Sequence, residues 1–282
     1  MAGLSSLLEK VNQLDPIPMV IHQVLSLVED PEASLKDLVA VVERDSAITA
    51  NLLRTVNSAQ MGLPVKVDSV QQAVAMLGLQ KVVEMVLSQN LCANLNRSQR
   101  GYGLAKGALW QQSLAVAMVA RTLARQRDLM SLPAIYTAAL LKDIGKVILH
   151  EYVADQIKAI QQLVAENGMS FVEAEKKVLG MDHTSLGGVI AKQWHFSPHM
   201  IYMIENHHLT IPASRNDPAT ATLYLADMVA MMVDTGIGVD RLAYHVYPDI
   251  FDEFFPDRQQ LKSLMITYKS CQHEIQGFLA AA

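Results

Sequence analysis

Helical periodicity is the feature that most constrains the fold of this chain. Apolar residues recur three and four positions apart along almost all of its 282 residues, and strict alternation of apolar and polar residues is hard to find. Between residues 46 and 59, for example, Ile48, Leu52 and Val56 lie on one stripe of a helix. Each such stripe needs a partner to cover it. The sequence therefore predicts an all-α, multi-helical protein.

Residues typical of helix starts divide the periodic pattern into separate helices. Pro18 favours a helix that begins at the next residue, and Ser197 followed by Pro198 is typical of a cap and first turn. Other starts pair a serine with an Asp, Gln or Glu three residues later, which allows reciprocal capping hydrogen bonds. These pairs are Ser34 with Asp37, Ser69 with Gln72, and Ser170 with Glu173.

The composition limits the class and the location of the protein. A chain with 51% hydrophobic residues can bury a full core in one large or two modest domains. No apolar run reaches the roughly 18 to 20 residues of a membrane span, and Glu9 interrupts the start earlier than a signal peptide would allow. The net charge of −5, without a Lys/Arg cluster, argues against a nucleic-acid surface. We expect a cytoplasmic protein that binds neither membrane nor nucleic acid.

A segment of low apolar content divides the chain into two expected lobes. Residues 96–106 contain few apolar side chains, and Gly101 and Gly103 lie among them, which favours a linker. We therefore expect an N-terminal helical lobe over residues 1–100 and a second helical lobe over residues 101–282.

The segment Leu-Lys-Asp-Ile-Gly-Lys-Val-Ile at residues 141–148 carries the most informative chemistry. It resembles the His-Asp signature of the HD superfamily of metal-dependent phosphohydrolases. In that signature adjacent His and Asp bind one metal, and a lysine after the glycine meets a phosphate. Asp143, Gly145 and Lys146 match the pattern, but Lys142 stands in place of the histidine. An ammonium has no lone pair for a divalent cation, so this metal ligand is lost.

Three spaced motifs in the N-terminal lobe carry a second resemblance. They are LDPIP at residues 14–18, RDSAITANLLRTVNSA at residues 44–59 and SVQQAVAMLGL at residues 69–79. In this order they resemble the HDOD family, the HD-related output domains of bacteria, and the resemblance covers about residues 14–209. It implies a two-lobed, all-helical architecture with an HD-like helical core, in cytoplasmic regulatory proteins usually without demonstrated catalysis.

The resemblance also implies a partly lost metal site. The helix that supplies an early histidine ligand in the superfamily is similar to residues 110–117, where that position is Gln112. Gln112 and Lys142 are thus two degenerate ligand positions. Ligand-type residues remain at Asp143, His183, His207, His208 and Asp227. We expect no cofactor, and the alternative is a residual Fe, Mn or Zn ion on these residues, because imidazole and carboxylate suit such metals.

Two lysines of the signature have alternative roles. Apolar neighbours at helical spacing place Asp227 toward the core, where a carboxylate needs a partner. Lys142 would either lie between Asp143 and Asp227 in place of a metal or bend to solvent. Lys146 would either meet a phosphate, with Gly145 allowing close approach of the backbone, or be a structural cation that answers a helix dipole.

These observations favour a non-catalytic signalling or scaffolding module with a degenerate phosphohydrolase pocket and a signalling protein as partner. One alternative is a metal-dependent phosphohydrolase that acts on a nucleotide or cyclic dinucleotide, with Asp143 and Lys146 as candidate catalytic residues. Another is a module that binds a nucleotide or phosphorylated small molecule on Lys146, His183 and His208 without hydrolysing it. No Walker-type loop, nucleophile elbow, dinucleotide fingerprint or paired Cys motif indicates a different catalytic site.

Overall fold

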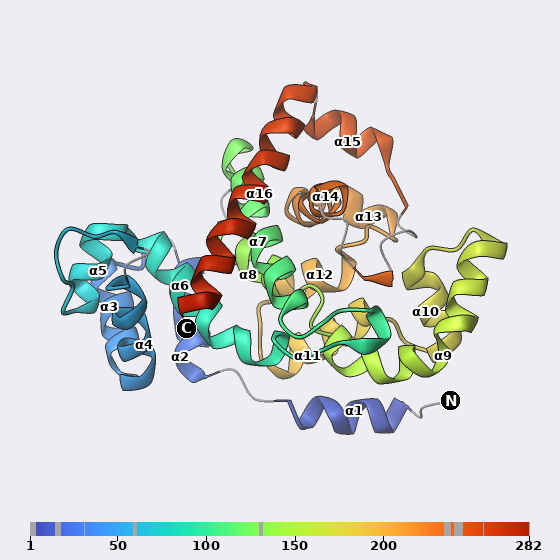
Figure 1. Cartoon of the computed structure of the whole chain (residues 1–282), viewed down its shortest axis with the longest axis horizontal. Coiled ribbons are helices and arrows are strands. Elements are labelled where there is room, and N and C mark those ends of the chain that lie inside the picture. Colours follow the sequence, from blue (N-terminus) through green and yellow to red (C-terminus); the bar gives the residue numbers. More distant parts are fainter. Residues whose placement is uncertain are drawn as a thin grey trace.

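The computed structural model describes residues 4–14, 18–30, 32–58, 61–129, 132–233, 238–239, 245–255 and 257–281. These residues form helices joined by turns and loops, and no strand occurs among them (Figure 1). The predicted all-α fold is confirmed. None of the helices in the described ranges is both long and apolar enough to cross a membrane.

The chain begins with α1 (Leu4–Asn12), α2 (Met19–Glu29), α3 (Leu35–Glu43), α4 (Ser46–Val56), α5 (Val70–Leu77) and α6 (Leu79–Leu95). A short 3-10 helix, η2 (Arg100–Tyr102), leads to α7 (Ala108–Gln126), α8 (Leu132–Leu141), α9 (Lys146–Asn167) and α10 (Phe171–Leu179). There follow α11 (His183–Gln193), α12 (Pro198–Asn206), α13 (Pro212–Arg215), α14 (Pro218–Val233), α15 (Pro248–Phe254) and α16 (Arg258–Ala281).

The capping residues of the sequence stand at observed helix starts. α2 follows Pro18, and α12 follows Ser197. Ser34, Ser69 and Ser170 precede α3, α5 and α10, and each side chain accepts a hydrogen bond from the amide three residues later. Local sequence therefore sets where these helices begin.

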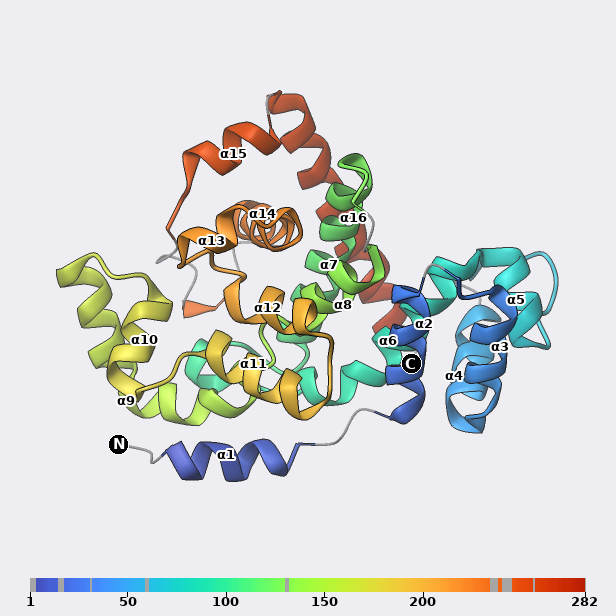
Figure 2. The same ribbon diagram turned by 180° about the vertical axis from the view of Figure 1, so that it is seen from behind.

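The centre of the molecule is formed by α7, α8 and α14. α7 packs against both of the others and against α16. α8 is buried from Ala134 to Leu141 and α14 from Ala219 to Met231, as expected for helices that are apolar on all sides. Next to this centre, α12 packs against α8, α11 and α14, and α9 packs against α10, α11 and η2 (Figures 1 and 2).

Helices α2 to α6 gather at one end of the molecule, where α2 and α6 contact α8 (Figure 1). α1 lies apart from them, beside α9 (Figure 2). There Leu7 and Val11 are buried, and Lys10 forms an ion pair with Glu151 of α9. The first helix therefore packs on α9, although the two are more than 100 residues apart in the sequence.

Residues 96–106, which their composition favoured as a linker, are packed into the protein. η2 contacts α9, and the side chains of Tyr102 and Leu104 are buried. A Cβ atom at Gly101 would lie 2.0 Å from the carbonyl oxygen of His150, so the absence of a side chain permits this close packing. The segment is packed on one side only, because Arg97, Arg100, Gly103, Ala105 and Lys106 are exposed.

Candidate functional site: a buried cluster of lysine, carboxylate and imidazole

The ligand-type residues of the sequence converge from several separate helices. Lys142 and Asp143 lie in the turn between α8 and α9, and Lys146 begins α9. The remaining members come from α11, the turn after α12, and α14. The full cluster is Lys142, Asp143, Lys146, His183, His207, His208 and Asp227, and every member is buried.

The ammonium of Lys142 contacts both carboxylates of this cluster. Its Nζ donates a hydrogen bond to Oδ2 of Asp143 and lies 2.8 Å from Oδ1 of Asp227. The three side chains are at most 1% exposed. Of the two roles that the sequence left open for Lys142, the structure therefore shows the internal ion pair and not the solvated side chain.

Burial and charge oppose each other in these ion pairs. Burial by itself would lower the pKa of Lys142, but the carboxylates of Asp143 and Asp227 outweigh it and raise that pKa above its ordinary value. Burial would likewise raise the pKa of Asp143, but the ammonium groups of Lys142 and Lys146 hold it well below its ordinary value. At neutral pH Lys142 is therefore protonated and Asp143 ionised.

Lys146 is held inside the same cluster. Its Nζ lies 2.9 Å from Oδ1 of Asp143 and 5.4 Å from the ring centroid of Tyr102. Because Lys146 begins α9, it stands at the positive end of the helix dipole, where a cation gains nothing from the dipole. The predicted dipole role is therefore wrong. A Cβ at Gly145 would lie 2.0 Å from the carbonyl oxygen of His183, so this glycine admits α11.

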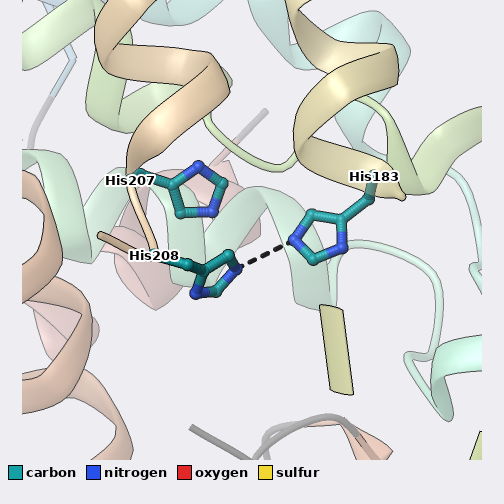
Figure 3. Close-up of side chains that lie close together, drawn as sticks. All are labelled: His183, His207 and His208. Carbon is teal, nitrogen blue, oxygen red and sulfur yellow. Dashed lines mark hydrogen bonds between the residues drawn. The ribbon is translucent and has the colours of Figure 1, made fainter. Parts of the chain in front are cut away.

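Three imidazoles lie close together (Figure 3). Two of them adjoin Asp143 of the ion pairs. Nε2 of His183 lies 3.0 Å from Nε2 of His208, and the ring centroids of His207 and His208 are 4.2 Å apart. One nitrogen from each ring lies within 4.8 Å of the other two. Oδ1 of Asp143 lies 3.6 Å from Nε2 of His183 and 3.8 Å from Nε2 of His207.

Glu175 of α10 orients His183. Its Oε2 accepts the backbone amide of His183 at 2.8 Å and lies 2.7 Å from Nδ1 of the ring, while its Oε1 accepts the hydroxyl of Tyr102. Burial would lower the pKa of His183, but the Glu175 carboxylate outweighs it and raises that pKa. Sequence reasoning missed Glu175 and Tyr102. A signal was available for Glu175, which falls on the same face of α10 as the buried Phe171.

His207 and His208 are held neutral by their surroundings. Burial, reinforced by nearby positive charge, lowers the pKa of both well below the ordinary histidine value. Nδ1 of His207 lies 2.8 Å from the carbonyl oxygen of Ile204 and must be the protonated nitrogen to donate there. Its Nε2 is then an acceptor, and it finds no hydrogen-bond donor among the described residues.

Gln112, the other degenerate ligand position, is buried on α7, which packs against α8 and α14. Its Oε1 has no hydrogen-bond partner within the described part of the chain. A separate cavity of about 540 Å³ lies between α10, the start of α11 and the end of α12. Its lining residues do not include Lys146, His183 or His208. The cluster is thus distinct from the cavity beside it.

Only part of the cluster has the ligands of the superfamily's metal centre. We distinguish the carboxylate side, with Asp143 and Asp227, from the imidazole side, with the three histidines. Between Asp143 and Asp227 the ammonium of Lys142 already supplies positive charge and offers no lone pair, so this side does not fit a metal ion. The imidazole side differs, because the buried Nε2 of His207 is an acceptor without a donor. That side fits a cation.

The fold and the cluster define a helical domain of the HD type with an altered His-Asp pair. The HDOD domain model matches residues 14–210, and the chain belongs to this family. The resemblance expected from three short motifs is therefore confirmed.

The chain is similar to a protein of Treponema pallidum (strain Nichols) named only as uncharacterized. The two are 22% identical over 271 residues, which cover 94% of this chain and 51% of the relative. The chain thus spans about half the length of the curated relative it matches. Activities, substrates and partners of the whole protein are therefore matters of proposal.

Two solved structures resemble almost the whole chain. One is an HDOD domain protein of unknown function from Geobacter sulfurreducens, with 19% identity, a TM-score of 0.66, and coverage of 97% of this chain and 92% of that one. The other, from Marinobacter aquaeolei VT8, is provisionally named as a signal transduction protein. It has 20% identity and a TM-score of 0.76, and the match covers 97% of this chain and 61% of that one.

A third structure, a provisionally named phosphohydrolase from Shewanella amazonensis SB2B, matches with 22% identity and a TM-score of 0.62. The match covers 93% of this chain and 88% of that one. At these identities the similarities establish a shared fold.

Proposed function

We propose that this chain is a non-catalytic HDOD module of a cytoplasmic bacterial regulatory system. The observation that carries the proposal is the ammonium of Lys142 between Asp143 and Asp227. An ammonium at this position neutralises the carboxylates, but it cannot lower the pKa of a bound water as a divalent metal does. The charges of the two carboxylates are therefore neutralised, but no metal-bound water is available at this position as a nucleophile.

A regulatory module of this kind acts through a signalling protein that binds its surface. The provisional name of the Marinobacter relative, a signal transduction protein, supports this class of function. The net charge of −5 supports a protein partner over nucleic acid.

An activity panel tests the proposal. Purified protein is assayed with nucleotides, cyclic dinucleotides and phosphomonoesters in the presence of added Mn²⁺ or Mg²⁺. We expect wild type to show no more turnover than Asp143→Ala. Asp155→Ala is the matched control, because Asp155 is exposed on α9, outside the cluster. Turnover that Asp143→Ala abolishes and Asp155→Ala retains would contradict the proposal.

The second candidate function is metal-dependent hydrolysis of a nucleotide or cyclic dinucleotide, with Asp143 and Lys146 in catalytic roles. The convergence of His183, His207 and His208 favours it, and the name of the Shewanella relative agrees. A third candidate is retention of a phosphorylated small molecule by Lys146, His183 and His208. Saturable nucleotide binding without turnover would distinguish this third function from hydrolysis.

A further inference from the structure

A cavity of about 540 Å³ lies beside the buried cluster and shares no residue with it. Its walls come from α10, the first turn of α11, the end of α12 and the loop that follows. The volume falls within the range of about 300 to 1,000 Å³ that is usual for small-molecule sites. The side chains that line the cavity decide which ligand it can hold.

The lining carries more negative than positive charge. It includes the carboxylates of Glu173, Asp182 and Glu205, and one ammonium, that of Lys176. Nζ of Lys176 lies 4.0 Å from Oδ2 of Asp182, and the lysine side chain is 65% exposed, so this ion pair is weak. A concave site with an excess of one charge attracts ligands of the opposite charge. The cavity therefore favours a cation, which can take the place of the Lys176 ammonium.

An anion does not fit the cavity, although a helix begins there. The start of α11 would offer backbone amides to an anion, but Asp182 already occupies this position. Its Oδ1 accepts hydrogen bonds from the amide of Ser185 and the hydroxyl of Thr184, each at 2.7 Å. Its Oδ2 accepts the hydroxyl of Ser185 at 3.1 Å. A phosphate or carboxylate ligand would be repelled by this buried carboxylate.

The carboxylates of the cavity do not surround a single point. Among the described residues, only the histidines of the cluster bring three ligand-type atoms within 4.8 Å of one another. The cavity is therefore not arranged for a metal ion, which needs its ligands on all sides. Apolar side chains also line it, because Val172 lies in one wall and Ile211, which is 44% exposed, lies in another. An organic cation with an apolar stem matches both kinds of lining.

Two of the carboxylates are held in place before a ligand arrives. A Cβ atom at Gly188 would lie 2.1 Å from Cγ of Glu205, so the stem of Glu205 lies against the bare backbone of α11. Its Oε1 accepts a hydrogen bond from Lys192 at 2.6 Å. Oε2 of Glu173 accepts the amide of Ser170 at 2.8 Å. Each carboxylate has further lone pairs for a ligand, and fixed side chains lose little freedom on binding.

We propose that this cavity binds an organic cation, an aliphatic amine or guanidinium compound with an apolar stem. Its charged groups pair with the three carboxylates, and its stem packs on the apolar lining. Near Asp182 it takes the place of the Lys176 ammonium. The same chemistry is found in a free diamine or polyamine and in an arginine side chain of a partner protein. The site goes beyond the proposed function, which requires no ligand in this cavity.

Calorimetric titration of the full chain with agmatine tests the proposal, because agmatine joins a guanidinium and an ammonium by a short alkyl stem. We expect saturation at one agmatine per chain, with an affinity that falls as the salt concentration rises. Spermidine should compete with agmatine. Glutarate and a neutral alkanediol of similar length should not bind, because the first is repelled and the second has no charge for the carboxylates.

Glu205→Gln should lower the affinity for agmatine at least about fivefold, because the amide keeps the shape and loses the charge-assisted hydrogen bond. Glu166→Gln is the matched control, since Glu166 is exposed on α9 and does not line the cavity. It should bind like wild type. Circular dichroism melting identifies folded samples.

The lysine gives a readout of the opposite sign. Lys176→Gln should raise the affinity for agmatine about twofold to fivefold, because the competing ammonium is removed. Lys177→Gln changes the net charge equally, but Lys177 does not line the cavity, so its affinity should match wild type. Both lysines are exposed on α10, and this pair of variants therefore keeps the test decisive if Glu205→Gln does not fold.

A capped tripeptide, acetyl-Ala-Arg-Ala-amide, separates the two sources of the cation. Tighter binding of agmatine than of the peptide assigns the cavity to a free small molecule, and the reverse assigns it to a basic side chain of a partner. Absence of saturation with agmatine, spermidine and the peptide would overturn the site. Equal binding of the alkanediol, or equal affinities of Lys176→Gln and Lys177→Gln, would also overturn it. The non-catalytic role stands in each case, since phosphate-ester turnover tests it separately.

Discussion

A single substitution relative to the HD signature changes the electrostatics of the pocket. Lys142 replaces a neutral ligand with a permanent cation, and Asp143 and Asp227 then have a partner inside the protein. A buried carboxylate without such a partner would be costly, because its desolvation is not compensated. Lys142 therefore neutralises the buried carboxylates, although it takes the place of a histidine that would bind the metal.

Replacement of Lys142 by an uncharged residue should destabilise the protein, because Asp143 and Asp227 would remain buried without a cation. We expect Lys142→Met to lower the free energy of unfolding by about 2 to 4 kcal/mol. Lys192→Met is the control, because the ion pair of Lys192 with Glu205 is largely exposed and contributes less than about 1 kcal/mol. Urea unfolding measures both. A variant Lys142→Met as stable as wild type would mean that Lys142 does not stabilise the two carboxylates.

The pKa shifts predict loss of stability in mild acid for the metal-free protein. The lowered pKa values of His207 and His208 mean that the unfolded chain binds their protons first as the pH falls below 6.5. Their contribution is full above pH 6.5 and decreases below it. The raised pKa of His183 acts in the opposite sense, since its contribution is present below pH 6.5 and lost at higher pH.

Because the pKa values of His207 and His208 are lowered and only that of His183 is raised, we expect the free energy of unfolding to decrease below pH 6.5. Urea unfolding at a series of pH values measures this slope. His207→Gln should flatten it and His199→Gln should not. An unfolding free energy independent of pH between 6.5 and 3.8, the ordinary pKa of aspartate, would contradict the prediction.

At the scale of helices, close backbone contact positions the cluster. α9 begins against the first turn of α11, and the missing side chain of Gly145 lets the two backbones meet. One of the two alternatives for Lys146 was that Gly145 lets the backbone approach a phosphate. The structure shows Gly145 against the start of α11, and this contact brings His183 next to Asp143 in the turn after α8.

We expect Gly145→Ala to destabilise the protein by about 1 to 3 kcal/mol or more through overpacking of this contact. Gly168→Ala is the comparison. Gly168 has a φ of 63° but open space around the added atom, so its cost is confined to backbone strain of about 1 kcal/mol. Thermal melting compares the two. Equal melting temperatures for both variants would show that the α9–α11 contact adjusts freely.

At the scale of the whole molecule, a packed segment connects α6 to α7. η2 lies on α9, and the hydroxyl of Tyr102 donates a hydrogen bond to Glu175, which orients His183 of the cluster. The segment that connects α6 to α7 is thereby in contact with the site.

Limited trypsin digestion distinguishes a packed joint from an exposed linker. Arg100 precedes the buried Gly101 and Tyr102, whereas Lys66 lies in a mostly exposed loop between α4 and α5. We expect cleavage after Lys66 to precede cleavage after Arg100, because a protease needs an unfolded backbone. Tyr102→Ala should accelerate cleavage after Arg100 alone. Early cleavage of wild type after Arg100, followed by mass spectrometry, would contradict the packed joint.

The sequence by itself determined the all-helical class, several helix starts, the family and the identities of the cluster residues. These are local properties: apolar spacing selects the helix, a serine cap selects its start, and a short motif names its ligand-type positions. They could be predicted because each depends on residues a few positions apart.

Only the tertiary structure decided how these residues pair. Lys142 meets Asp227 across 85 positions, and Tyr102 meets Glu175 across 73, so neither contact appears in any local pattern. The packing of Gly101 and Tyr102 against α9 was missed for the same reason, since their partners on α9 are about 50 positions away in the sequence. The sequence gives the residue type and therefore the charge of a side chain, but its partner and its desolvation depend on which helices pack around it.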